Sequence, residues 1–200
     1  MAKSKKSKNK SSIIINVICL ILSALLVATF FMPTYTTGLE DNKSAFNGVV
    51  LTQAMFMSEE DVQQATENSL NFLKYNEEER TDYANLVEAY AHIHNEDNTG
   101  FKFSIIVNWM VLIAGIVCAV ISLFALIGKA NGLGLIISTL VGVAASVALL
   151  ILTTTYAKAV YDASLIKDLV TITAGAGVWV ALASSVLACG ASITGKFLKK

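Results

Sequence analysis

Residues 132–155 read GLGLIISTLVGVAASVALLILTTT, and this run contains no charged side chain. The hydrocarbon core of a bilayer is about 30 Å thick, so an α-helix needs roughly 20 apolar residues to cross it. The run meets that length, and it therefore predicts a transmembrane helix.

Three further runs of the same kind lie on either side of it, at residues 13–32, 103–127 and 169–193. Apolar residues make up 54% of the 200-residue chain, and they gather in these runs instead of recurring at the periods of a soluble core. Pro33 directly follows the first run and is a natural helix stop. The sequence thus predicts an all-α membrane protein built on a four-helix transmembrane bundle.

The charged residues predict how the bundle is oriented. Acidic and basic residues balance at 15 each, but the loop at 33–102 holds 13 of the acids. The tails at 1–12 and 194–200 and the turn at 128–131 contain lysines and no acid. The positive-inside rule places lysine-rich segments in the cytoplasm. We therefore expect a multi-pass protein of the plasma (cell) membrane, with both termini cytoplasmic and the first loop outside.

The short loop at 156–168 lies outside in this topology, and its charges balance. Lysine outnumbers arginine by 14 to one, a bias associated with A/T-rich genomes, so we expect a bacterial source. The bilayer is the partner that the four runs require.

The basic tail at 1–12 allows two other interpretations. A cleavable secretory signal also begins with basic residues, but its apolar run is usually only about 7–15 residues long, and Ala28-Thr29-Phe30 is not a small-x-small cleavage site. Five lysines would also attract nucleic acid, but no aromatic side chain lies between them for bases to stack on. We expect a disordered topogenic tail and no nucleic-acid partner.

Small residues recur every fourth position in the third run. They are Gly134, Ser138, Gly142 and Ser146. Lipid gives helices no hydrophobic drive to associate, so close helix contacts depend on small residues aligned along one face. We expect this small-residue ladder to be a helix-packing face, used within the bundle or in self-association.

The loop at 33–102 is too long for a bare connector, so we expect a helical extracytoplasmic domain. Ser58 and Asn76 each precede three acidic residues, which is the pattern of an N-cap and an acidic first helical turn. They predict helices over about 58–75, with Leu70 and Leu73 as apolar contacts, and about 76–94. The segment 46–57 is compatible with a strand, a helix or an interfacial segment.

Two groups of side chains in this loop are candidates for a partner surface. The apolar group is Val49, Met55, Phe56 and Met57, and the acidic group is Glu77, Glu78 and Glu79. Exposed methionine and aromatic side chains supply contact area, and carboxylates steer basic partners. The alternative is that the apolar group seats the loop on its own helices or on the membrane interface.

No arrangement in the sequence predicts enzymatic chemistry. Glu88, His92 and Glu96 recur every four residues and could share a divalent metal, but an exposed acidic helix face explains this spacing more simply. The chain contains no HExxH motif, nucleophile elbow or phosphate-binding loop. Cys19, Cys118 and Cys189 lie within the apolar runs, where cysteine commonly acts as a small apolar residue. We therefore expect no metal, cofactor or disulfide.

Four spans with cytoplasmic ends, a large first outside loop and a small second one resemble the layout of claudin-like tetraspan proteins. The resemblance implies a membrane-organising, adhesive or accessory role. It is one of layout, because residues 33–102 contain neither the Trp nor the Cys pair of the claudin first-loop signature. No functional residue carries over from that family.

We accordingly expect a non-enzymatic structural or accessory protein that presents its acidic loop to a partner or to itself. The alternative is an oligomeric channel or transport component. Its pore would lie between subunits and be lined by Ser and Thr residues such as 153–155, Thr171 and Thr173. Against transport, the four runs lack the ionisable residue that ion-coupled carriers usually hold in the membrane.

Overall fold

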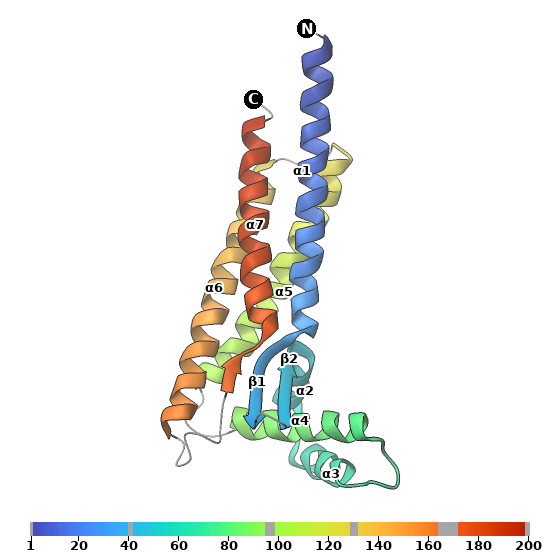
Figure 1. Ribbon diagram of the computed structural model, residues 1–200, viewed down its shortest axis with the longest axis vertical. Helices are drawn as coiled ribbons and strands as arrows, with labels where there is room; N and C mark the ends of the chain where they lie inside the picture. The colour runs from blue at the N-terminus through green and yellow to red at the C-terminus, as the bar shows by residue number, and fades with distance from the viewer. Residues whose placement is uncertain (1, 40–41, 95–98, 129–131, 164–171, 199–200) are drawn as a thin grey trace. The chain divides into compact units, whose positions relative to one another are not determined.

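The computed structural model describes residues 2–39, 42–94, 99–128, 132–163 and 172–198 (Figure 1). The chain divides into two compact units. The helical unit comprises Met1–Thr29, Val107–Ala148 and Val178–Lys200. The α/β unit comprises Phe30–Ile106 and Leu149–Gly177.

Four long helices account for most of the chain. They are α1 (Ala2–Ala28), α5 (Thr99–Leu126), α6 (Gly132–Ala163) and α7 (Ala176–Leu198). Each supplies a stretch long and apolar enough to cross a membrane, and the first of these stretches continues into the short 3-10 helix η1 (Thr29–Phe31). The prediction of a mostly helical, multi-pass membrane protein with four apolar helices is confirmed.

The helical unit buries small polar side chains and exposes large apolar ones. Cys19, Ser122 and Ser185 are at most 1% exposed, whereas Ile14 and Leu187 are about 60% exposed. This is the opposite of a soluble core, and it is the arrangement by which helices approach closely when hydrocarbon surrounds them. Gly115 illustrates the approach, because an added Cβ there would lie 3.0 Å from the side chain of Val27.

Among the long helices, the start of α1, the end of α6 and the start of α7 differ most from the sequence-based expectation. α1 begins at Ala2, so the lysine-rich tail continues the first helix instead of being disordered. Lysine is a good helix former, and the tail extends a helix that the apolar residues have already nucleated. α6 runs on to Ala163, so the first half of the supposed loop at 156–168 is helical. α7 begins only at Ala176, because Ile172–Ala174 form strand β3 and not part of the fourth span.

The α/β unit contains a three-stranded sheet that the expected all-helical domain lacked. Strand β1 (Pro33–Leu39) pairs antiparallel with β2 (Asn42–Asn47) and with β3, giving the order β2-β1-β3. Tyr35 in the central strand lies opposite Phe46 on one side and Ala174 on the other. β-Branched and aromatic residues in β1 and β3 favour the pleated conformation.

Two glycines allow backbone segments of this unit to approach closely. A Cβ at Gly175 would collide with the carbonyl of Pro33, and the Gly175 amide donates to the Thr34 carbonyl over 2.8 Å. A Cβ at Gly48 would lie 2.5 Å from the ring of Phe30. Glycine is therefore required at both positions.

Helix α2 (Gly48–Phe56) settles the undecided segment at 46–57. Phe46 and Asn47 end β2, and the Asn47 side chain then caps α2 by accepting from the Val50 amide over 2.9 Å. Leu51 and Ala54 are fully buried within the unit. The segment is thus a strand end followed by a helix.

Helices α3 (Glu59–Ser69) and α4 (Glu77–His94) begin where the sequence predicted. Ser58 and Asp61 form a reciprocal capping box at the start of α3. Asn76 and Glu79 form a second one, with bonds of 2.9 and 3.0 Å, at the start of α4. Both N-cap predictions are confirmed. The predicted end of α3 near residue 75 is wrong, because the helix stops at Ser69.

Candidate functional site

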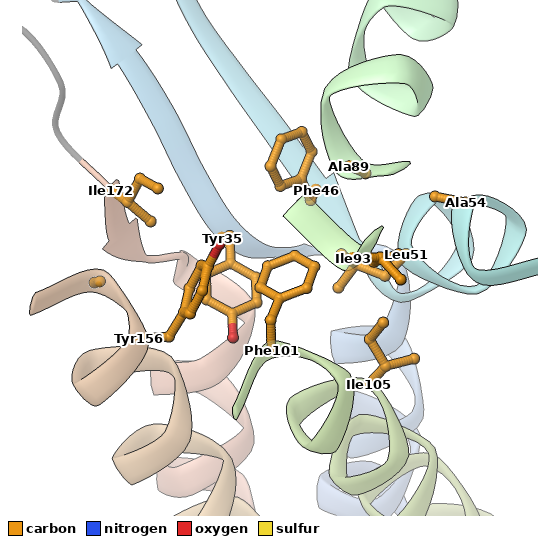
Figure 2. Close-up of a cluster of buried hydrophobic side chains, with 11 residues drawn as sticks. Tyr35, Phe46, Leu51, Ala54, Ala89, Ile93, Phe101, Ile105, Tyr156 and Ile172 are labelled. Atoms are coloured by element: carbon orange, nitrogen blue, oxygen red, sulfur yellow. The ribbon is translucent and has the colours of Figure 1, made fainter. Parts of the chain in front are cut away.

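The core of the α/β unit is an aromatic cluster that joins β1 to the unit's parts of α5 and α6. Tyr35 stacks on Phe101 at 4.8 Å between ring centroids, and Tyr156 lies 4.7 Å from Phe101 (Figure 2). Tyr35 also meets Tyr156 edge-on at 5.7 Å. All three side chains are at most 5% exposed. Such ring pairs stabilise a core beyond the area that they bury.

Polar groups at the edge of this cluster make two hydrogen bonds and one longer contact. The Thr37 hydroxyl donates to the Glu88 carboxylate over 2.7 Å, and a Glu88 oxygen lies 3.9 Å from His92 Nε2. His92 Nδ1 lies 2.9 Å from the Tyr156 hydroxyl. On the other side of the cluster, the Tyr35 hydroxyl donates to Ser104 over 2.7 Å. The phenols are thus satisfied inside the core.

Burial perturbs the titration of two groups in this network. Desolvation lowers the pKa of His92, and the nearby Glu88 carboxylate offsets part of that change. Desolvation likewise raises the pKa of Tyr35, and its hydrogen bond to Ser104 opposes the change. Both groups are therefore held in their neutral forms at neutral pH.

The 3.9 Å between Glu88 and His92 is longer than the roughly 2.6–3.2 Å over which a proton is transferred directly. Tyr156 is 5% exposed, and its hydroxyl lies against His92. The described residues contain no cluster of three or more metal-ligating side chains. The sequence suggested Glu88, His92 and Glu96 as possible metal ligands. Glu96 lies outside the described residues, while Glu88 contacts Thr37 and His92 contacts Tyr156. These contacts join α4 to β1 through Thr37 and to α6 through Tyr156.

Helices α3 and α4 lie side by side (Figure 1). The turn that connects them, residues 70–76, is apolar and exposed. Leu70 is 67% exposed, Phe72 is 73% exposed, and Leu73 is fully exposed. We call these three side chains the apolar tip. Leu70 and Leu73 were expected to be helix contacts, so that prediction is wrong.

Local contacts give the turn a defined conformation. The Lys74 amide donates to the Asn71 side chain over 3.1 Å, and the Tyr75 amide donates to the Asn71 carbonyl over 3.2 Å. The Arg80 guanidinium lies 4.0 Å from the centroid of the Phe72 ring, within the range of a cation–π interaction. These contacts fix the backbone of the turn and the Phe72 ring, which reduces the entropy that binding would cost.

Charged side chains of both signs lie near this tip: Arg80 contacts the Phe72 ring, Lys74 is exposed within the turn, and carboxylates flank the turn in the sequence. Glu77, Glu78 and Glu79 form the exposed first turn of α4, directly after the turn, and Glu67 is exposed near the end of α3. The predicted acidic group thus lies beside an apolar surface, although not beside the one that the sequence suggested.

The predicted apolar group is divided by the structure. Met55 and Met57 pack against the unit's core cluster, and Val49 is half-buried. Only Phe56, at 78%, is strongly exposed. Most of this group therefore seats α2 on its own unit, which is the alternative that the sequence left open.

The small-residue ladder lies in the helical unit. Ser138, Gly142 and Ser146 are buried, and Gly134 is half-buried. A Cβ added at Gly142 would lie 3.5 Å from Leu26 and 3.8 Å from both Ala114 and Ser185. Gly142 thus faces α1, α5 and α7 together.

No protein-family model, curated protein or solved structure matches this chain. Its function must therefore be argued from the chemistry of its own residues.

Sequence patterns did not reveal the apolar tip or the aromatic network. Leu70, Phe72 and Leu73 look like a helix continuation until α3 is seen to stop at Ser69. An available signal was Asn71, whose side chain caps a turn by accepting a backbone N–H. Tyr35, Phe101 and Tyr156 come from three distant segments, and no local pattern brings them together.

Proposed function

We propose that this chain is a non-enzymatic accessory protein of the cell membrane that docks a partner protein through the apolar tip and its acidic border. One observation carries the proposal: three large apolar side chains are exposed on a hydrogen-bonded turn, outside the candidate membrane spans and directly before Glu77–Glu79. Large apolar side chains that are exposed together, with polar residues at their border, mark interaction surfaces. The partner should offer an apolar pocket bordered by Lys or Arg.

Magnitudes restrict the kind of partner. Burying a leucine or phenylalanine side chain fully contributes about 1.5–3 kcal/mol. Three such side chains do little more than offset the loss of translational and rotational freedom, which costs roughly 4–15 kcal/mol on association from solution. A partner confined to the same membrane has a much higher effective concentration. We therefore propose another membrane protein, or a second copy of this chain, as the partner.

The proposed orientation has both termini in the cytoplasm and the apolar tip outside. The lysines of residues 2–10, and Lys196 in the last turn of α7, support it through the positive-inside rule. The layout shared with claudin-like tetraspan proteins fits an accessory role of this kind.

The alternative of a pore between subunits has less support among the described residues. The hydroxyls of Thr153 and Thr154 donate to the carbonyls of Leu149 and Leu150 in their own helix. They are therefore not free donors for a solute. Thr173 lies on β3, and Thr171 lies outside the described residues.

A photocrosslinking amino acid at position 73, introduced into the full chain in its native membrane, tests the docking proposal. We expect a discrete crosslinked product at Leu73 and none at Ala91, which is also exposed on α4 but far along the helix from the turn. Replacing Glu77, Glu78 and Glu79 together with Gln should weaken the product at Leu73. A chain that gives no adduct at Leu73 in native membranes has no docked partner there, and the proposal fails.

A further inference from the structure

One serine hydroxyl inside the helical unit lacks a hydrogen bond. Ser122 on α5 is fully buried, and its Oγ has no partner in the part of the chain that the structure describes. The other buried serine and threonine hydroxyls described in this unit each donate to a backbone carbonyl three or four residues earlier, as Ser146 does to Gly142 over 2.8 Å. Ser122 is the exception, and a buried polar group without a partner is costly.

Small polar side chains of the other three long helices are buried in the same part of the unit. They are Cys19 on α1, Ser138 and Thr139 on α6, and Cys189 and Ser192 on α7, and each is at most 9% exposed. We call these residues, together with Ser122, the polar layer. The hydroxyls of Thr139 and Ser192 lie 3.1 Å apart, and the Cys19 thiol lies 3.9 Å from the carbonyl oxygen of Ala188 on α7. The layer therefore joins α1, α6 and α7.

Contacts of α5 place Ser122 at the height of this layer. A Cβ at Gly115 would lie 3.0 Å from Val27, so α5 meets α1 there. The two helices run in opposite directions, and Ser122 and Cys19 lie about two turns beyond that contact, toward the same end of the unit (Figure 1). A Cβ at Gly134, one turn before Ser138 on α6, would lie 3.8 Å from Ile121, the neighbour of Ser122. Ser122 is thus the contribution of α5 to the polar layer.

The chemistry of the layer selects a small neutral ligand. Its members offer hydroxyl and thiol groups and no charge, so an ion would lose its hydration there without an opposite charge to compensate. The surrounding helices cover Ser122 completely, so neither a lipid headgroup nor a second chain reaches its hydroxyl. Water both donates and accepts, and a buried water typically makes about three hydrogen bonds to polar groups that are otherwise unsatisfied.

We propose that the polar layer binds one ordered water molecule, which accepts a hydrogen bond from the Ser122 hydroxyl. The protons of this water go to hydroxyl or thiol groups of the layer on the neighbouring helices. The water thereby links α5 to the rest of the unit by a polar bridge, at a depth where hydrocarbon offers no other partner. This site is independent of the docking proposed for the apolar tip.

X-ray footprinting of the full chain in phosphatidylcholine nanodiscs tests this proposal. X-rays split water into hydroxyl radicals, and a radical formed from a bound water oxidises adjacent side chains even when a scavenger removes radicals from the bulk solvent. Mass spectrometry should find scavenger-resistant oxidation at Cys19 or Cys189, several-fold above the unirradiated sample, and none at Met110. Met110 also carries a reactive sulfur, but it is 47% exposed on a candidate span. Absence of such oxidation at both cysteines would overturn the proposal.

A matched pair of serine variants makes the test specific. Ser122→Ala removes the hydroxyl that holds the water, so it should lower the scavenger-resistant oxidation several-fold. Ser146→Ala removes an equally buried hydroxyl that donates to Gly142, and it should leave the oxidation unchanged. Equal oxidation in the two variants would overturn the proposal.

The melting temperature of Ser122→Ala gives a second readout with a decisive sign. A hydroxyl bonded to water contributes to stability, so its loss should lower the melting temperature, whereas removal of a buried hydroxyl without any partner should raise it. A higher melting temperature than wild type would therefore mean that the layer is dry, and the proposal would fail. If Ser122→Ala does not fold, the oxidation of the wild-type cysteines decides.

Discussion

At the scale of single residues, His92 makes the α/β unit sensitive to acid. Burial lowers the pKa of His92, so the folded unit favours the neutral imidazole, while the unfolded chain takes up a proton near the ordinary value of 6.5. Stability is therefore complete above about pH 6.5 and declines as the pH falls through that value toward the lower pKa of the folded state. The His92–Tyr156 bond and the rings around it are what protonation disturbs.

Thermal unfolding of the detergent-purified chain between pH 8 and pH 5 measures this effect. The wild-type melting temperature should drop below about pH 6.5. The drop should be smaller in His92→Gln, which retains a side chain able to bond Tyr156. His94 is the control: it is exposed and stacks on Tyr90, so His94→Gln should keep the pH dependence. An equal drop in both variants would assign the acid sensitivity to another group.

Gly175 supports a second prediction at this scale. In Gly175→Ala the methyl group would collide with the Pro33 carbonyl, so β1 and β3 must separate. A clash with backbone is not relieved by a rotamer change, and we expect a loss of about 1–3 kcal/mol in the stability of the α/β unit. Amide hydrogen exchange of β1 reports it. Gly100→Ala, where a Cβ meets nothing within 4 Å, should leave exchange in β1 unchanged.

At the scale of elements, the small-residue ladder predicts which helix face resists substitution. Gly142→Leu would force side-chain atoms into the space occupied by Leu26, Ala114 and Ser185, and overpacking of this kind typically costs about 1–3 kcal/mol. The variant should melt at a lower temperature in detergent. Gly190→Leu, on an open helix face, should melt like the wild type. Indistinguishable melting of the two variants would mean that the face around Gly142 is not tightly packed.

The elements also show what sequence can and cannot predict here. The apolar runs and both N-caps were found because length, charge and capping residues are local signals. Strand β3 was missed, since Ile-Thr-Ala within an apolar run is as compatible with a membrane helix as with a strand. Pairing with β1 decides between the two, and that partner lies more than 130 residues away. The apolar tip was missed for a related reason: the turn that follows Ser69 interrupts what composition alone would continue as a helix.

At the scale of the whole molecule, the lysine distribution predicts a membrane topology that cysteine labelling can test. A cysteine at Ser7 should react with a membrane-impermeant maleimide only after cells are opened, whereas one at Glu60 should react in intact cells. The three native cysteines are buried, so background labelling of them should be low. Reaction at position 7 in intact cells would reverse the orientation and place the apolar tip in the cytoplasm.

The pairing of β1 with β3 has a consequence for how the protein is made. Central strand β1 emerges early from the ribosome, but its second edge stays open until residues 172–174 have been synthesised, just before the last helix. An unpaired strand edge invites association with other chains. Nascent chains should therefore depend on a chaperone until translation is nearly finished, and truncation before residue 172 should leave the α/β unit prone to aggregation.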